Sequence, residues 1–192
     1  MCSRNCSDLL KKACLYAGCR PDRPDEAIEA MCVRALEELR DLAQFQYRYA
    51  HFDAVIAELE KEPYRTFLQD APGYYLIATT LGAAVDRRIH QLSQSDMPYM
   101  VVFNAAAAAY LEYLADAFEE ENLPGGPFVR FCPGYGGSRV SDLTVLQNYL
   151  PVGKIGMEVR ESGMLLPEKS MIGIVRQRPV RRKQQKRTDS EA

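Results

Sequence analysis

The amino-acid sequence predicts a single α+β domain with a largely antiparallel mixed sheet flanked by helices. Helical and strand patterns are mixed along the chain without the regular strand–helix–strand alternation of a parallel sheet. The length of 192 residues fits one ordinary domain, and 47% apolar with 26% charged residues is a globular composition. The chain can therefore build a substantial core, and a largely disordered or collagen-like protein is excluded.

Five segments have the apolar spacing of helices. Ser7 is placed to cap the first of them, and Gly18 ends it. The longest contains five consecutive alanines, which would let another backbone approach closely, and the breaker sequence NLPGGP ends it. The predicted helices span residues 7–18, 25–43, 83–92, 96–121 and 141–150, with one or two further helical turns within 62–70.

Other segments have the composition of strands. The strongest is GYYLIATT, which gathers aromatic and β-branched residues behind a Pro-Gly turn. The aromatic stretch FQYRYAHFDAV alternates enough to form another. The predicted strands span residues 45–55, 73–80, 128–132, 156–160 and 171–175.

Charge is distributed unevenly along the chain. Residues 1–175 carry 17 Lys and Arg against 24 Asp and Glu, whereas residues 176–192 carry 7 against 2. The last segment is almost devoid of apolar residues, so we expect an acidic folded domain over 1–175 and a basic, disordered tail over 176–192. The tail could contact nucleic acid, an anionic membrane or an acidic partner, or it could serve only to keep the protein in solution.

Several protein classes are not expected. The two longest uncharged runs, 71–85 and 97–111, have fifteen residues each and are shorter than the roughly 20 that cross a bilayer. The first thirty residues lack the apolar region of a secretory signal, so we expect a cytoplasmic protein. The six cysteines form no CxxC pair, which favours free thiols over a zinc or iron–sulfur site.

The sequence RFCPGYGGSR, residues 130–139, is the strongest candidate for a binding loop. Glycines allow a ligand to approach the backbone, and exposed amides beside a guanidinium suit a carboxylate or a phosphate. The glycines do not follow the dinucleotide pattern GxGxxG, and no P-loop lysine follows them. The same loop could also be a simple strand-to-helix connection.

The order of motifs around this loop resembles a known family. Arg130 and Gly134-Tyr135 form an RxxxGY motif, followed by Glu161-Ser162 and by the Pro-x-x-Ser segment that ends at Ser170. Together with LGAAVDRRI at residues 81–89, this order resembles the activation domain of cobalamin-dependent methionine synthase, particularly its free-standing relatives. The resemblance covers about residues 7–175.

The resemblance implies a site for S-adenosylmethionine. Arg130 would meet the methionyl carboxylate, the backbone from Cys132 to Gly134 would bond the ligand, and Tyr135 would pack against it. Glu112 would receive the ammonium group or a ribose hydroxyl, although Glu112, Asp116 and Glu119 at helical spacing also describe a solvated helix face. The family has a tyrosine just after its Ser-x-x-Gly segment, and here Val175 ends that region, so Val175 would take this place in the ligand site without an aromatic ring.

The implied role is that of an accessory protein in methionine synthase reactivation rather than of a complete enzyme. S-adenosylmethionine would remethylate cobalamin carried by the cobalamin-binding domain of a partner synthase, with reduced flavodoxin or a similar donor supplying one electron. A sulfonium is already a good leaving group, so no catalytic acid or base is implied. A non-catalytic sensor or adaptor that binds the same ligand is the alternative, and we do not expect a membrane or nucleic acid as partner.

Overall fold

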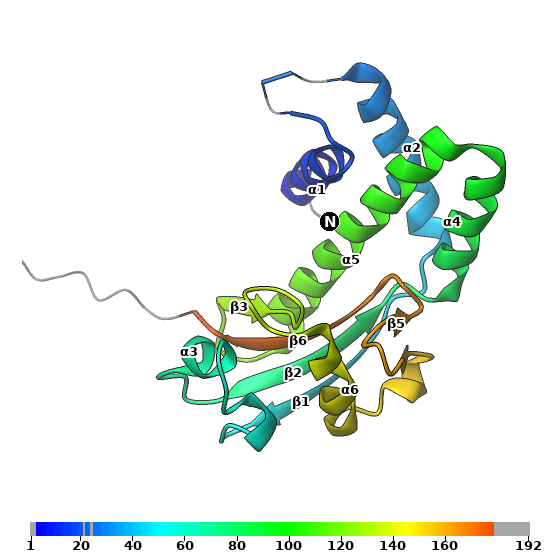
Figure 1. Cartoon of the computed structure of the whole chain (residues 1–192). Helices are drawn as coiled ribbons and strands as arrows, with labels where there is room; N and C mark the ends of the chain where they lie inside the picture. The colour runs from blue at the N-terminus through cyan, green and yellow to red at the C-terminus, as the bar shows by residue number, and fades with distance from the viewer. Residues whose placement is uncertain (1–2, 21, 24, 179–192) are drawn as a thin grey trace, which may run out of the picture.

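A computed structural model describes residues 3–20, 22–23 and 25–178, with side chains from Ser7 onward. Four helices form one layer of the molecule, and the longest of them continues from this layer across the sheet (Figure 1). They are α1 (Ser3–Tyr16), α2 (Glu26–Leu42), α4 (Ala83–Ser95) and α5 (Met97–Asn122).

The helix ends follow the capping residues of the sequence, with one exception. Asp25 caps α2 by accepting the N–H groups of Ala27 and Ile28 at 3.0 and 3.1 Å. Helix α1 ends at Tyr16, and Gly18 in the turn after it has a φ of +96°, a conformation that glycine adopts without strain. The predicted start at Ser7 is wrong, because α1 begins one turn earlier at Ser3 and Ser7 lies inside it.

The described strands form a four-stranded sheet and a two-stranded sheet, and every pairing is antiparallel. The strand order of the larger sheet is β1-β2-β6-β3. This arrangement confirms the predicted α+β class, in one compact domain. The strands are β1 (Gln46–Phe52), β2 (Tyr74–Thr80), β3 (Phe128–Phe131), β4 (Glu158–Val159), β5 (Leu165–Leu166) and β6 (Ser170–Gln177).

Short elements cover the face of the sheet opposite α5. The predicted helix over 141–150 is wrong as one helix, because it divides into one α-helical turn between two 3₁₀ turns. The predicted strand over 156–160 shrinks to β4, which pairs with β5 outside the main sheet. The short elements are η1 (Ala57–Leu59), α3 (Tyr64–Leu68), η2 (Val140–Asp142), α6 (Leu143–Leu146), η3 (Gln147–Tyr149) and η4 (Val152–Ile155).

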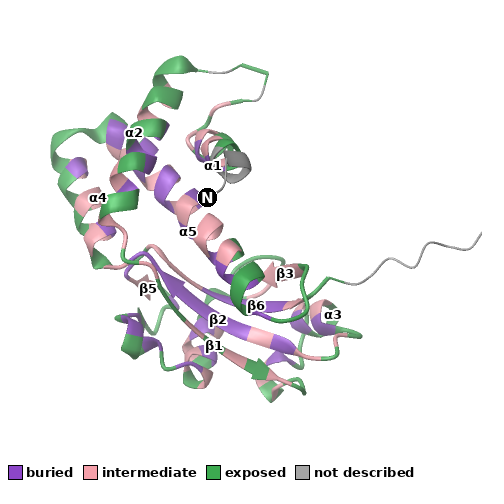
Figure 2. Cartoon of the chain, turned by 180° about the vertical axis from the view of Figure 1, so that it is seen from behind, coloured by how far each residue is buried: buried purple, intermediate pink, exposed green. Residues whose placement is uncertain are grey.

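Buried side chains form two large clusters joined by a small one. One fills the helical layer, and a second lies between the sheet and its short elements. The third lies where α5 crosses the sheet and includes Ile77, Phe118, Leu123 and Val175. Helix α5 therefore has buried residues along most of its length (Figure 2).

Two further sequence-based expectations concern the cysteines and membrane-spanning helices. The four cysteines whose side chains are described, Cys14, Cys19, Cys32 and Cys132, are free thiols. Within the described part of the chain, no helix combines the length and apolar content of a membrane span.

Strand β6 extends beyond the predicted end of the domain at residue 175. Arg176 and Gln177 pair with β3, and the N–H of Arg178 donates to the carbonyl of Pro127 at 2.8 Å. The Arg176 guanidinium also lies 5.1 Å from the centre of the Phe67 ring. The rest of the predicted disordered tail, 179–192, lies outside the described residues.

We predict that the domain ends at Arg178 rather than Val175. A chain that ends at Arg178 should have the melting temperature of the full chain, because residues 179–192 contain almost no apolar side chains. A chain that ends at Val175 should melt about 4 °C lower, because it loses the last pairings of β6 with β3. Differential scanning calorimetry measures both, and equal melting temperatures for the two shortened chains would contradict this boundary.

Candidate functional site

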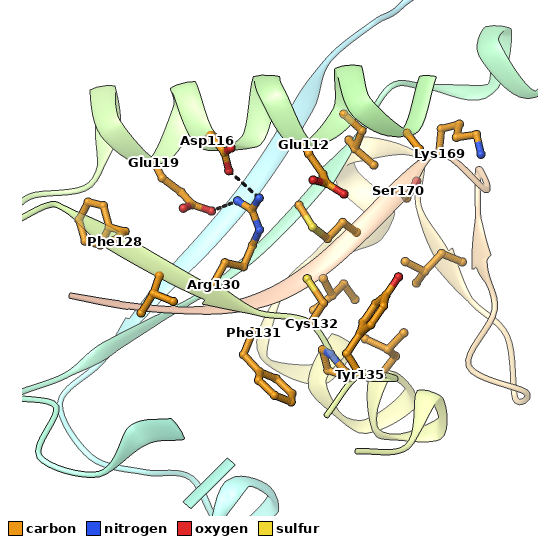
Figure 3. Close-up of a pocket in the computed structure, with 18 of the residues that line it drawn as sticks. Glu112, Asp116, Glu119, Phe128, Arg130, Phe131, Cys132, Tyr135, Lys169 and Ser170 are labelled. Carbon is orange, nitrogen blue, oxygen red and sulfur yellow. Dashed lines mark hydrogen bonds and ion pairs between the residues drawn. The ribbon is translucent and has the colours of Figure 1, made fainter. Parts of the chain in front are cut away.

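A cavity of about 750 Å³ lies between the C-terminal half of α5, strand β3 and the start of β6. Figure 3 shows α5 on one side, β3 with the loop after it on a second, and the segment entering β6 between them. The cavity brings together residues from distant parts of the sequence. Four of the six residues singled out in the sequence line it: Glu112, Arg130, Cys132 and Tyr135.

Arg130 reaches this cavity from the edge strand β3, where it pairs with Val175 of β6. Its side chain crosses β6 because Gly173 leaves room: a Cβ at Gly173 would lie 2.8 Å from Cδ of Arg130. Nη1 of Arg130 donates to Oε1 of Glu119, and Nη2 donates to Oδ1 of Asp116 at 2.7 Å (Figure 3). These two ion pairs join the sheet edge to the long helix.

The two ion pairs of Arg130 differ in their exposure to solvent. The side chains of Arg130 and Glu119 are 12% and 7% exposed, whereas that of Asp116 is 55% exposed. Burial acts to lower the pKa of Arg130, but Glu119 and Asp116 outweigh it and raise that pKa above its usual value. Arg130 is therefore a permanent cation with one buried partner and one exposed partner.

Glu112 lies one turn before Asp116 and is held from α1. The Tyr16 hydroxyl donates to both carboxylate oxygens of Glu112, at 2.9 and 3.1 Å, and Lys12 forms an ion pair with the same group. The alternative that Glu112, Asp116 and Glu119 form a solvated face is wrong for Glu119, which is buried beneath β3. Glu112 contacts α1, and Asp116 pairs with Arg130 of the sheet while it stays exposed to solvent.

The glycine-rich loop forms the outer rim of the cavity. Gly134 has a φ of +100°, and its N–H donates to Oγ of Ser138 at 2.9 Å. The Ser138 hydroxyl in turn donates to the carbonyl of Tyr135 at 2.6 Å. The loop thus uses its own polar groups to form a tight turn, and it leaves Tyr135 74% exposed at the rim.

The other two predicted residues lie off the cavity wall. Gly134 shapes the rim from within the loop. Val175 is fully buried in the cluster with Ile77 and Phe118, beneath the C-terminal part of α5. Its contribution here is to the packing of the sheet.

The structure adds a cavity residue that sequence reasoning missed. Lys169 lies on the segment entering β6, and burial lowers its pKa against the opposing effect of Glu168 and Asp86. Asp86 of α4 fixes this segment by accepting the N–H groups of Glu168 and Lys169 at 2.5 and 3.3 Å. Lys169 belongs to the quoted Pro-x-x-Ser segment, which was the available signal, but its spacing does not show which way the side chain faces.

The fold and the cavity define an α+β protein with an open site of mixed charge at one edge of its sheet. Five carboxylates and three cations line that site. Neither charge dominates, which suits a ligand that itself carries both signs.

No family model matches the sequence, and no curated protein matches it. The structure is similar to that of the MetH reactivation domain bound to AdoHcy, with a TM-score of 0.62 and 16% sequence identity. The similarity covers 91% of this chain and 77% of the other. At this identity the comparison shows a shared fold.

We predict that the buried ion pair of Arg130 and Glu119 stabilises the domain. Arg130→Ala should lower the free energy of unfolding by about 3–5 kcal/mol at neutral pH, because it leaves a buried carboxylate without its cation. Burial raises the pKa of Glu119 and Arg130 acts to lower it, so the loss of Arg130 raises this pKa further and the folded variant is relieved of its unpaired charge when Glu119 is protonated at lower pH. The loss of unfolding free energy caused by Arg130→Ala should therefore be smaller at about pH 5 than at about pH 7.5.

Urea denaturation at the two pH values measures this effect. The double variant Arg130→Ala/Glu119→Ala is the control, and it should recover part of the lost stability because no charge remains buried alone. A deficit that is independent of pH, or a double variant less stable than Arg130→Ala, would contradict the ion-pair assignment.

Proposed function

We propose that this protein binds S-adenosylmethionine in the cavity and supports the reductive remethylation of cobalamin on a methionine synthase, in the cytoplasm. The observation that carries the proposal is the convergence of Arg130, Tyr135 and Glu112 on one cavity, in a fold shared with the MetH reactivation domain bound to AdoHcy. Arg130 and Tyr135 come from the RxxxGY motif of the sequence resemblance, and Glu112 is the acid on the long helix that the resemblance implies as a ligand contact.

The cavity suits the size and charge of the proposed ligand. Pockets for ligands of this kind measure roughly 300–1,000 Å³, and this one measures about 750 Å³. S-adenosylmethionine carries a carboxylate, an ammonium group and a sulfonium. A guanidinium matches the first, and the carboxylates along α5 match the two cations.

Arg130 can bind the methionyl carboxylate without losing its buried partner, Glu119. The guanidinium has five N–H donors in a planar fork. The bond to Glu119 is buried and stays, whereas the bond to the exposed Asp116 can exchange for a ligand carboxylate of the same charge. The released Asp116 then lies beside the ligand, where it faces the cationic groups.

Tyr135 and the rim around it provide the proposed docking face for the partner. Tyr135, Val140 and Met164 are large apolar residues that are 74%, 46% and 61% exposed. Val140 contacts Gly163, so the loop and the β4–β5 hairpin lie side by side at the mouth of the cavity. Exposed apolar surface of this kind marks interaction sites in other proteins.

The protein contributes to the reaction by positioning. When bound, S-adenosylmethionine would supply a methyl group to the reduced cobalt of the partner and would be left as S-adenosylhomocysteine. Arg130 would hold the methionyl carboxylate, Glu112 would receive the ammonium group or a ribose hydroxyl, and Tyr135 would offer an aromatic face to the sulfonium or the adenine. The open cavity leaves the methyl group accessible to a cobalamin domain docked at the rim.

Isothermal titration calorimetry with S-adenosylmethionine tests the ligand assignment. Wild-type protein should bind, and Arg130→Lys should bind about 10–30-fold more weakly, because lysine keeps the charge but loses the bidentate fork. Arg160→Lys, on the exposed β4–β5 hairpin, is the matched control and should bind like the wild type. Equal affinities for wild type and Arg130→Lys would refute the role of Arg130.

A reconstitution assay tests the activity and separates it from the sensor or adaptor alternative. A partner synthase inactivated to cob(II)alamin should recover turnover only with this protein, S-adenosylmethionine and a one-electron donor such as reduced flavodoxin. Tyr135→Ala should reduce this recovery without lowering the melting temperature, since an exposed rim residue adds little to the core.

The exposed Tyr49→Ala on β1, at the opposite edge of the sheet, is the control and should leave recovery unchanged. Ligand binding without any effect on cobalt methylation would favour the sensor or adaptor.

A further inference from the structure

Helix α1 contacts the cavity wall through one carboxylate. The hydroxyl of Tyr16 lies 2.9 Å from Oε1 and 3.1 Å from Oε2 of Glu112, and Nζ of Lys12 pairs with Oε2. Glu112 is also a lining residue of the cavity between α5 and β3. One side of this carboxylate therefore faces α1 and the other faces the proposed ligand.

This contact limits the conformations of Glu112. A glutamate on a helix surface samples many rotamers, and ordering it costs conformational entropy. Tyr16 and Lys12 order it in advance of any ligand. A carboxylate offers about four lone-pair positions, so it can accept from α1 and still receive an ammonium or a hydroxyl.

The Tyr16 hydroxyl remains a donor at all ordinary pH values. Burial and the hydrogen bond to Glu112 together raise the pKa of Tyr16 to about 12. Tyr135 and Asp116 contribute in the same direction.

The backbone of Tyr16 is itself fixed. Tyr16 is the last residue of α1, and the turn after it is closed by N–H bonds from Gly18 to Leu15 and from Cys19 to Cys14, at 3.1 and 2.9 Å. Leu9 and Ala13 anchor the same helix in the core that it shares with α5. The phenol thus projects from a rigid support.

We propose that Tyr16 is a positioning residue of the ligand site, which orients the Glu112 carboxylate toward the bound ligand and makes the N-terminal helix part of that site. The inference rests on the proposed function, since its ligand is S-adenosylmethionine. Tyr16 acts through Glu112, so its effect on binding requires that carboxylate.

A double-mutant cycle measured by calorimetry with S-adenosylmethionine tests this dependence. Tyr16→Phe removes one oxygen atom and should weaken binding about 5–10-fold, as expected for a lost hydrogen bond to a charged group. Glu112→Gln should weaken binding at least as much. Adding Tyr16→Phe to Glu112→Gln should cause little further loss, because the carboxylate that Tyr16 orients is gone.

Tyr113→Phe is the matched control. Tyr113 lines a pocket between α1 and α5 together with Lys12, and the Tyr113→Phe variant should bind the ligand like the wild type. Each variant is also checked for an unchanged melting temperature.

A second measurement reports the contact without any ligand. At about pH 10.5 an ordinary tyrosine is largely ionised, so Tyr16→Phe should leave the tyrosinate absorbance of the protein unchanged if Tyr16 stays protonated. Glu112→Gln should increase that absorbance, because part of the cause of the raised pKa is removed.

The outcomes separate the two proposals. Wild-type protein that does not bind S-adenosylmethionine overturns the proposed function, and the inference with it. Wild-type binding with an unaffected Tyr16→Phe variant, or with losses that add in the double variant, overturns the role of Tyr16 alone. A drop in tyrosinate absorbance at pH about 10.5 in Tyr16→Phe overturns the contact itself.

Discussion

The structure depends on one helix that has to pack in two places at once. Helix α5 contributes fully buried alanines, Ala106, Ala107 and Ala109, to the helical core, and it places Phe118 on the sheet near its other end. Small side chains let the neighbouring helices approach closely, and an aromatic ring fills the wider gap above the strands. The cavity lies on a remaining side of this helix, so its acidic wall is as rigid as the two cores that α5 connects.

The elements that the sequence predicted well are those with long, regular patterns. The periodicity that indicated α5 and the β-branched run that indicated β2 both come from side chains packed in the core. Both elements can therefore be predicted from a short stretch of sequence. The segment 141–150 has the same apolar positions as a helix, but it bends to pack beneath a curved sheet and forms separate turns. Strand β4 is short because its partner is another two-residue strand rather than the main sheet.

The site was only partly predictable for a different reason. The RxxxGY motif located Arg130 and Tyr135 at the cavity because both lie in one contiguous loop and strand. The burial of Glu119 depends on β3 lying above it, and the contact of Tyr16 with Glu112 joins residues 96 positions apart. Helical spacing states which carboxylates share a face, but it contains no information about which distant element covers that face.

The lack of a Cβ atom at Gly173 has a consequence for the comparison of related sequences. The aliphatic part of Arg130 occupies the space where a Cβ of residue 173 would lie. Positions 173 and 130 are therefore expected to covary. A homologue with a residue larger than glycine at position 173 would have to redirect or replace the arginine at position 130. This pair is a marker, readable from an alignment, for separating chains that keep the cationic site from those that retain only the fold.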